Sequence, residues 1–241
     1  PVGDAATGEA REAQVFIAVM GASNYTYAEA SFGQDLASWT GAHRRCFEYM
    51  GGVPRVVVPD NLKSGVQKPH RYEPDINPTY AELATHYGVA VLPARVRAPR
   101  DKAKAEAGVL LVERWILARL RNRTFFSLEA LGEAIAELLL VLNDRPFQKL
   151  PGSRRSRFEA IDRPALRPLP AEPWQFATWK KARVNIDYHI EVEGHYYSVP
   201  HHYAREQVDI RLTAGTVECF LGGERIASHV RQMRQGRHTT V

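Results

Sequence analysis

Two carboxylates in the chain stand where they could hold a divalent metal ion. Asp60 follows a short apolar run, and Glu106 follows a basic stretch further along the chain. Hard cations such as Mg²⁺ prefer carboxylate oxygens and keep several water ligands, so two or three acids from separate elements suffice. Paired metals in such a site activate a nucleophile and stabilise the leaving oxygen of an in-line phosphoryl transfer. Asp60 and Glu106 are therefore the candidate catalytic and metal-binding residues.

The elements around Asp60 indicate an α/β domain. Residues 13–20 and 25–30 favour strands on either side of a turn, which predicts a hairpin, and the spacing of apolar residues over 35–50 predicts a helix. The run 55–58 then predicts a short buried strand ending just before Asp60. Ligands of open α/β sheets bind at that end of the strands. An acid that forms only an Asx-turn explains Asp60 equally well and needs no function.

Glu106 belongs to a helix predicted over 101–121. A helix over 78–87, with an Asn77 cap and a Gly88 stop, and a strand over 89–92 precede it, and Ser127 caps another helix. An acid near a helix start is expected from the helix dipole alone. The functional interpretation therefore depends on the combination of a strand-end acid, another strand, a basic loop and a helix-borne acid. Glu113, two turns further along, is the rival residue.

The order of these elements predicts the domain organisation. A hairpin followed by alternating helices and strands over residues 1–150 indicates an α/β domain with a mixed sheet. Residues 3–9 look like the turn of an earlier hairpin whose first strand would precede Pro1. Residues 151–182 are rich in proline and arginine and predict an extended linker. Residues 183–241 contain five or six short strands with tight turns and predict a small all-β barrel.

The chain carries a net charge of +5 and a pI near 9.3, which mildly favours a polyanionic partner such as DNA. Arginine runs at 154–157 and 231–237 add to a basic stretch around Glu106. A solvated loop and helix start would explain that stretch without any partner. The candidate DNA-binding residues are Lys63, Arg95, Arg97, Arg100, Lys102 and Lys104.

Several other functions lack their sequence signals. No apolar stretch is long enough to span a membrane and no signal peptide is visible, so we expect a cytoplasmic protein. Cys46 and Cys219 are expected to be buried thiols. The chain has neither a Gly-rich phosphate loop nor a nucleophile elbow. His195, His201 and His202 fit no zinc pattern and are expected to be half-exposed. Packing explains Tyr196, Tyr197 and Tyr203 more simply than base stacking does.

Longer motifs carry a resemblance to a known family. The segments VFIAVMGASNYTYAEA, VVVPDNLKSGV, PRDKAKAE, VERWILARLRNRTFFSL and NDRPFQKLPGSRRSRFEAIDRPALRPLP resemble IstA-type transposases of bacterial insertion sequences. The tail VNIDYHIEVEGHYYSVPHHYAREQVDIRLTA is similar to the C-terminal β-domain of the same family. The resemblance covers essentially the whole chain, and it implies an RNase H-like core of the retroviral-integrase type.

The resemblance also implies roles for the acids. In the family three acids bind Mg²⁺, for which Mn²⁺ can substitute. The second falls on the aspartate of the PDN motif, Asp60, and the third on the glutamate after DKAKA, Glu106. The first lies on an opening strand upstream of the hairpin, and this sequence contains no match to it, since Asp4 is in the wrong place. We therefore expect the isolated chain to be inactive. The family's N-terminal helix-turn-helix is not matched either, and the final residues fall short of the family's tail.

The activity implied is Mg²⁺-dependent 3′-end processing and strand transfer in insertion-sequence transposition. The partners implied are transposon-end and target DNA, other copies of the transposase, and an IstB-type ATP-binding helper protein. One alternative is a non-catalytic remnant that binds DNA or a transposase subunit. An RNase H-like nuclease without a role in transposition is a second, and the long C-terminal match argues against it.

Overall fold

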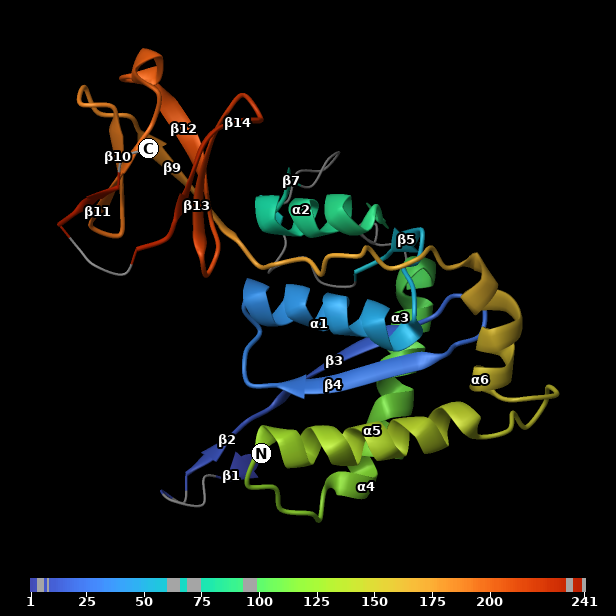
Figure 1. Cartoon of the computed structure of the whole chain (residues 1–241). Helices are drawn as coiled ribbons and strands as arrows, with labels where there is room; N and C mark the ends of the chain where they lie inside the picture. The colour runs from blue at the N-terminus through green and yellow to red at the C-terminus, as the bar shows by residue number, and fades with distance from the viewer. Residues whose placement is uncertain are drawn as a thin grey trace. The chain divides into compact units, whose positions relative to one another are not determined.

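The computed structural model describes residues 1–3, 7, 9–59, 66–68, 75–92, 99–232 and 236–239, with the backbone alone for 66–68, 75–76 and 99–102. The chain divides into two compact units, Pro1–Trp174 and Gln175–Val241 (Figure 1). The first unit mixes helices and strands and the second consists almost entirely of strands, so the predicted mixed α/β class is confirmed.

The first unit contains the predicted hairpin. Strand β3 pairs antiparallel with β4, from Gln14 opposite Ser31 to Val19 opposite Thr26. A second small pair precedes it, and its first strand was expected upstream of Pro1. That expectation is wrong, because β1 already lies within the chain and Gly3 N donates to Phe125 O at 2.8 Å. The strands are β1 Val2–Gly3, β2 Ala10–Arg11, β3 Gln14–Val19 and β4 Thr26–Ser31.

Two helices follow the local signals of the sequence closely. Helix α1 (Leu36–Met50) begins where the Asp35 side chain accepts a hydrogen bond from Ser38 N at 2.9 Å. It ends at Gly51, whose φ of 70° is a left-handed conformation that glycine adopts without strain. Helix α2 (Pro78–Tyr87) has the predicted Asn77 cap and ends in the same way at Gly88.

The strand before Asp60 differs from its prediction. β5 (Val56–Val57) pairs in parallel with β8 (Ala90–Val91), as the α/β pattern predicts. It was expected to be buried, but Val56 is 43% exposed and Val58 is 47% exposed. Among the described strands β5 and β8 form a two-stranded sheet of their own, separate from β3–β4. A further antiparallel pair joins β6 (Val66–Lys68) to β7 (Asp75–Ile76).

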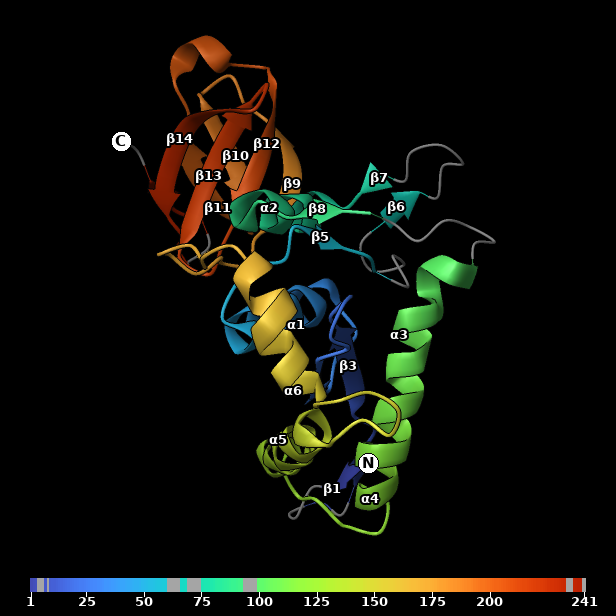
Figure 2. The same ribbon diagram turned by 90° about the vertical axis from the view of Figure 1, so that its right-hand side faces the viewer.

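Helices on both sides of the β3–β4 hairpin enclose the core of the first unit (Figures 1 and 2). The helix predicted over 101–121 is α3 (Pro99–Val112), which continues through a π-helical turn at Glu113–Leu117 into α4 (Ala118–Leu120). Helix α5 (Leu128–Asp144) starts at the predicted Ser127 cap. Side chains buried between these elements are Tyr25, Cys46, Val112, Ile116, Phe125, Ile135 and Leu139.

The segment expected to be an extended linker contains helical turns. These are α6 (Arg154–Arg157), a π-helical turn at Phe158–Asp162 and a 3₁₀ turn at Arg163–Ala165. Phe158 is buried and stacks on Tyr25 with ring centroids 4.3 Å apart. The proline content indicated an extended chain, but burial of Phe158 fixes the segment as part of the first unit.

The second unit consists of two sheets around one apolar core. The described strands pair in the orders β14-β13-β12-β9 and β10-β11-β15, so the predicted closed barrel is not confirmed. The expected strand at 183–186 is wrong, because β9 ends at Arg183 and Ile186 is 72% exposed. The strands are β9 Thr178–Arg183, β10 His189–Val192, β11 His195–Ser198, β12 Gln207–Leu212, β13 Thr216–Leu221, β14 Glu224–Val230 and β15 His238–Thr239.

Two expectations from composition are also met by the described residues. Cys46 and Cys219 are both buried free thiols. None of the helices described is long and apolar enough to cross a membrane.

Candidate functional site

Glu106 lies on the exposed face of α3, turned away from the hairpin. Gly108 packs directly against β3, since a Cβ added there would lie 2.3 Å from Val19 Cγ2. Val112, one turn further on, is completely buried. Successive residues of a helix are about 100° apart, so Glu106 falls nearly opposite Gly108. Glu106 is therefore exposed on the side of α3 that the hairpin does not cover.

Glu113 shares that face. It is exposed and begins the π-helical turn. Seven residues along a helix bring a side chain back to nearly the same direction, so Glu106 and Glu113 point the same way two turns apart. Orientation does not choose between them, and Glu113 remains the rival.

Asp60 lies outside the described residues, but the strand before it is described. β5 runs parallel to β8, with Val56 opposite Ala90 and Val57 opposite Val91. The carboxyl ends of parallel strands lie at one edge of a sheet, which is the ligand-binding edge of open α/β folds. In the sequence Asp60 comes three residues after β5, and α3 with Glu106 is the helix that follows β8.

Of the six predicted DNA-binding residues, the structure describes the side chain of Lys104 alone. Lys63, Arg95 and Arg97 lie outside the described residues, and Arg100 and Lys102 lie on α3 with side chains that are not described. Lys104 is exposed, and its ammonium group donates to Gly21 O and, at 3.3 Å, to Asn24 Oδ1 in the turn between β3 and β4.

Two of the arginines in the run 154–157 also contact other side chains of the first unit. Arg155 pairs with Asp144, and the Arg154 guanidinium lies over the Phe147 ring, 5.3 Å from its centroid. Burial of the Arg154 guanidinium is the main cause that lowers its pKa, and the positive charge of the neighbouring Arg145 lowers this pKa further.

Two residues near the hairpin turn were missed by sequence reasoning. The Asn143 side chain accepts from Thr26 N at 3.0 Å and donates to Thr26 O at 2.8 Å. Asp162, itself buried, accepts from Ser23 N at 2.9 Å. Both residues lie in the quoted family motif that starts NDRPF, but nothing in their local sequence identifies the partner more than a hundred residues away.

The three histidines singled out in the second unit differ in burial: His201 and His202 are exposed in the 3₁₀ turn His201–Tyr203, whereas His195 is buried. His195 was expected to be half-exposed, yet it is 3% exposed and its Nε2 lies 2.9 Å from Thr239 Oγ1. This correction follows from the pairing of β11 with β15, which covers the side chain. Tyr197 is buried in the core, and Tyr196 stacks on His238. Among the described residues no three His, Cys, Asp or Glu side chains are arranged to bind a metal.

Three residues with strongly shifted pKa values, His43, Cys46 and Cys219, are buried in the apolar cores and do not form a catalytic centre. His43 is buried among aromatic rings, and this burial lowers its pKa to about 4. Burial likewise raises the pKa of Cys46 far above its usual range and that of Cys219 to about 12. Strong displacement is often a mark of functional sites, but here simple burial accounts for it.

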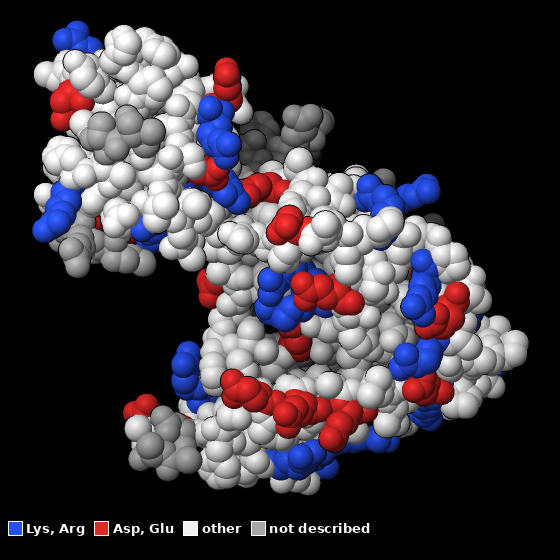
Figure 3. Space-filling model, in the orientation of Figure 1, with Lys and Arg blue, Asp and Glu red and all other residues white. Residues whose placement is uncertain are grey.

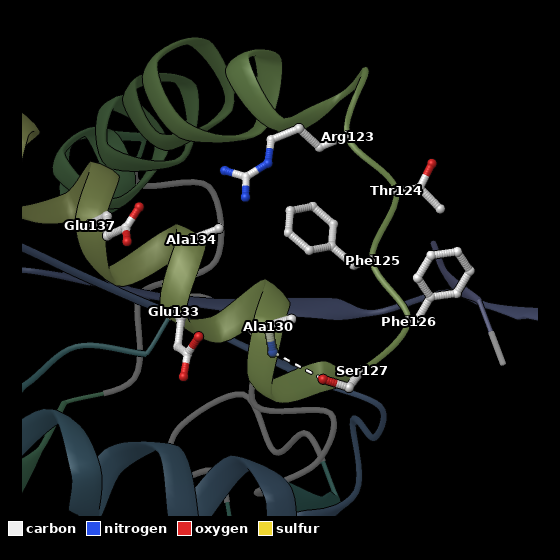
Figure 4. Close-up of a pocket in the computed structure, with 9 residues that line it drawn as sticks. All are labelled: Arg123, Thr124, Phe125, Phe126, Ser127, Ala130, Glu133, Ala134 and Glu137. Atoms are coloured by element: carbon white, nitrogen blue, oxygen red, sulfur yellow. Dashed lines mark hydrogen bonds between the residues drawn. The ribbon is translucent and has the colours of Figure 1, made fainter. Parts of the chain in front are cut away.

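One face of the first unit is acidic. Glu129, Glu133 and Glu137 are exposed at intervals of four along α5, and Figure 3 shows acidic side chains in a row there. Beside them is a pocket of about 370 Å³ between α5 and the preceding loop, lined by Arg123, Phe125 and Phe126 among others (Figure 4). Carboxylates gathered in this way disfavour the approach of a phosphate backbone to this face.

Known proteins similar to the chain are transposases. Residues 169–241 match the family model of the Mu transposase C-terminal domain. The chain is 53% identical over 230 residues to a putative transposase for insertion sequence IS408 from Burkholderia multivorans, covering 95% of this chain and 44% of the relative. It is 53% identical to a putative transposase for IS1162 from Pseudomonas fluorescens, covering 100% and 43%. The IS21 transposase of Pseudomonas aeruginosa is 30% identical over 77% of this chain and 47% of the relative.

Two solved structures are more distantly similar. One is a chain of the simian T-cell lymphotropic virus intasome in complex with the PP2A regulatory subunit B56 gamma, with 12% identity, a TM-score of 0.49 and coverage of 90% of this chain and 69% of that one. The other is the catalytic core domain of BIV integrase, with 11% identity, a TM-score of 0.47 and coverage of 62% and 88%.

The expected resemblance is confirmed by the curated relatives. The chain spans about half the length of those it matches, 44% and 43% of the two most similar ones described above. The similarity nevertheless extends over 95% or more of the chain itself, across both compact units. The chain is therefore similar, over nearly its whole length, to part of the putative transposases of bacterial insertion sequences.

Proposed function

We propose that the chain contains part of the catalytic core of a DNA transposase, which performs phosphoryl transfer at transposon ends with Asp60 and Glu106 as metal-binding carboxylates. The observation that carries the proposal is the parallel β5–β8 pair. In the sequence Asp60 follows β5. The helix that comes after β8 is α3, on which Glu106 is exposed.

The donor atoms at this edge suit a hard divalent cation. Asp60 and Glu106 offer carboxylate oxygens, which Mg²⁺ and Mn²⁺ prefer to nitrogen or sulphur. When bound, the metal ions would polarise the phosphoryl group and lower the pKa of the attacking water or hydroxyl. Glu106 would supply one ligand, and Asp60, which lies outside the described residues, would supply another.

The remaining features of the proposal rest on the family. An RNase H-like core, 3′-end processing followed by strand transfer, other copies of the transposase and an IstB-type helper are all part of it. The basic residues from Arg95 to Lys102, with Lys63, would lie along DNA, and the acidic face of α5 would point away from it. The 241 residues by themselves would be inactive, because only two of the three acids are assigned in them.

A strand-transfer assay with pre-cut transposon ends tests the catalytic proposal. We expect no product from the chain alone with Mg²⁺ or Mn²⁺, and product from a version extended upstream by a strand carrying a further acid. In that version Asp60→Asn and Glu106→Gln should each abolish product, while Glu113→Gln should retain it. Full activity of either of the first two variants would remove that residue from the site.

DNA binding separates the catalytic proposal from the remnant alternative. Binding through lysine and arginine releases condensed counterions, so the logarithm of the affinity falls with the logarithm of salt concentration by about 0.9 for each phosphate neutralised. We expect such a dependence for the chain alone. A chain that binds DNA this way, while its extended version makes no product, would be a binding remnant. A flat dependence would argue against the basic residues as a DNA surface.

A further inference from the structure

The turn between β3 and β4 is tied to α3 by one side chain. The Lys104 ammonium group donates to the carbonyl oxygen of Gly21 and lies 3.3 Å from Asn24 Oδ1. The turn itself is tight, since Asn24 N donates to Met20 O at 3.2 Å and Met20 N donates to Tyr25 O at 2.9 Å. Hydrogen bonds from a charged donor are stronger than neutral ones. The Lys104 side chain, although exposed, therefore has defined partners in the hairpin turn.

The same turn is fixed from two other directions. Ser23 is completely buried and its N–H donates to the Asp162 carboxylate. Thr26, at the start of β4, donates its backbone N–H to the Asn143 side-chain oxygen, and its carbonyl accepts from the Asn143 side-chain nitrogen. Lys104, Asp162 and Asn143 come from three separate elements. The turn is thus a rigid anchor, and a helix attached to it is held in place.

A second contact lies one helical turn beyond Lys104. Gly108 approaches β3 so closely that a Cβ there would meet Val19 Cγ2. Lys104 and Gly108 are four residues apart and share the face of α3 that meets the hairpin. Glu106 lies between these two contacts in sequence and on the opposite face. Its position relative to the hairpin is consequently determined by both.

We propose that Lys104 is a positioning residue, which holds the N-terminal turns of α3 on the β3–β4 turn and thereby sets where the Glu106 carboxylate lies. The sequence alone had placed Lys104 with the DNA-binding residues. A phosphate contact would require the ammonium group to face DNA, whereas here it binds the Gly21 carbonyl and the Asn24 amide oxygen. The importance of this role for catalysis rests on the proposed function, but the anchoring itself does not.

Hydrogen exchange of the whole chain tests the anchoring. In Lys104→Met the backbone amides of residues 102–108 and 20–25 should exchange severalfold faster, because the first turns of α3 lose their attachment. Arg114→Met, an exposed substitution on the same helix, is the matched control and should leave those amides unchanged. Asn24→Gly removes one acceptor and tolerates the left-handed φ of 57° at that position, so it should give a smaller increase. Unchanged exchange in Lys104→Met overturns the proposal.

DNA binding distinguishes a positioning residue from a phosphate contact. The salt dependence of Lys104→Met should match that of the unchanged chain, whereas loss of one phosphate contact lowers the slope by about 0.9. Such a fall would overturn the proposal whatever the exchange shows. In a version active in strand transfer, Lys104→Met should reduce kcat with little change in KM for DNA, and Lys104→Arg should restore part of it. If no version is active, the transposase proposal fails while the exchange result still decides the anchoring.

Discussion

His43 shows at the scale of a single residue how burial, rather than a catalytic partner, displaces a pKa in this chain. Its ring packs edge-on against Trp39 and Tyr80, and one ring nitrogen lies 2.9 Å from Trp39 O. The imidazole is fully enclosed, which disfavours its charged form and lowers its pKa to about 4. Glu106, by contrast, is exposed on the face of α3 that points away from the hairpin, and its role as a metal ligand remains a prediction.

The His43 pKa predicts a loss of stability in mild acid. The unfolded chain takes up a proton near pH 6.5 and the folded chain only near pH 4, so the free energy of unfolding falls as the pH drops between these values. The full effect is on the order of 3 kcal/mol, since one pKa unit corresponds to about 1.4 kcal/mol.

Urea denaturation at pH 6.5, 6.0, 5.5 and 5.0 would measure this slope in the range where most carboxylates stay ionised. His43→Gln should flatten it, while the exposed control His86→Gln should keep it. An unchanged slope in His43→Gln would show that His43 is not the group responsible.

At the scale of elements, the contact between α3 and β3 constrains the sequence more than helix propensity does. Gly108 and Gly132 are both glycines within helices, where alanine is intrinsically the better residue. Gly132 on α5 has no atom within 4 Å of an added Cβ, whereas Gly108 is in contact with Val19. The same substitution should therefore have opposite effects at the two positions.

We expect Gly132→Ala to stabilise the first unit by about 0.5–1 kcal/mol, through helix propensity and a less flexible unfolded chain. Gly108→Ala should destabilise it by about 1–3 kcal/mol, because the added methyl group must displace Val19 or move the helix. Thermal unfolding of the two variants beside the parent chain would compare them directly. Stabilisation by Gly108→Ala would contradict the close approach of α3 to β3.

At the scale of the whole molecule, the division into two units has a thermodynamic consequence. Each unit has its own apolar core, one built around the β3–β4 hairpin and its helices and the other between two sheets. A substitution in one core should affect the unfolding of that unit and leave the other largely unchanged.

Calorimetry with one conservative substitution in each core would test this independence. Ile210→Val in the second unit and Ile135→Val in the first remove one methylene each from side chains that are 1% exposed. Each should cost about 0.5–1.5 kcal/mol and lower only its own transition. A single transition shifted equally by both variants would mean that the two units unfold together.

The sequence by itself determined the features whose signals are local. The Asp35, Asn77 and Ser127 caps set where helices begin, and Gly51 and Gly88 set where they end, because a cap and its helix are only a few residues apart. The similarity to insertion-sequence transposases likewise followed from contiguous motifs. Asp60 remains a prediction from its motif, and the choice of Glu106 over Glu113 also still depends on the resemblance.

Only the tertiary structure decided the features that join distant parts of the chain. It pairs Asn143 with Thr26, buries His195 under β15 and folds residues 154–165 onto the first unit. It also gives Lys104 partners in the hairpin turn, where the charge pattern had indicated DNA. Contacts between residues that are 44 to 117 positions apart leave no local pattern. The physical reason is that the packing of whole elements, rather than any neighbouring residue, brings them together.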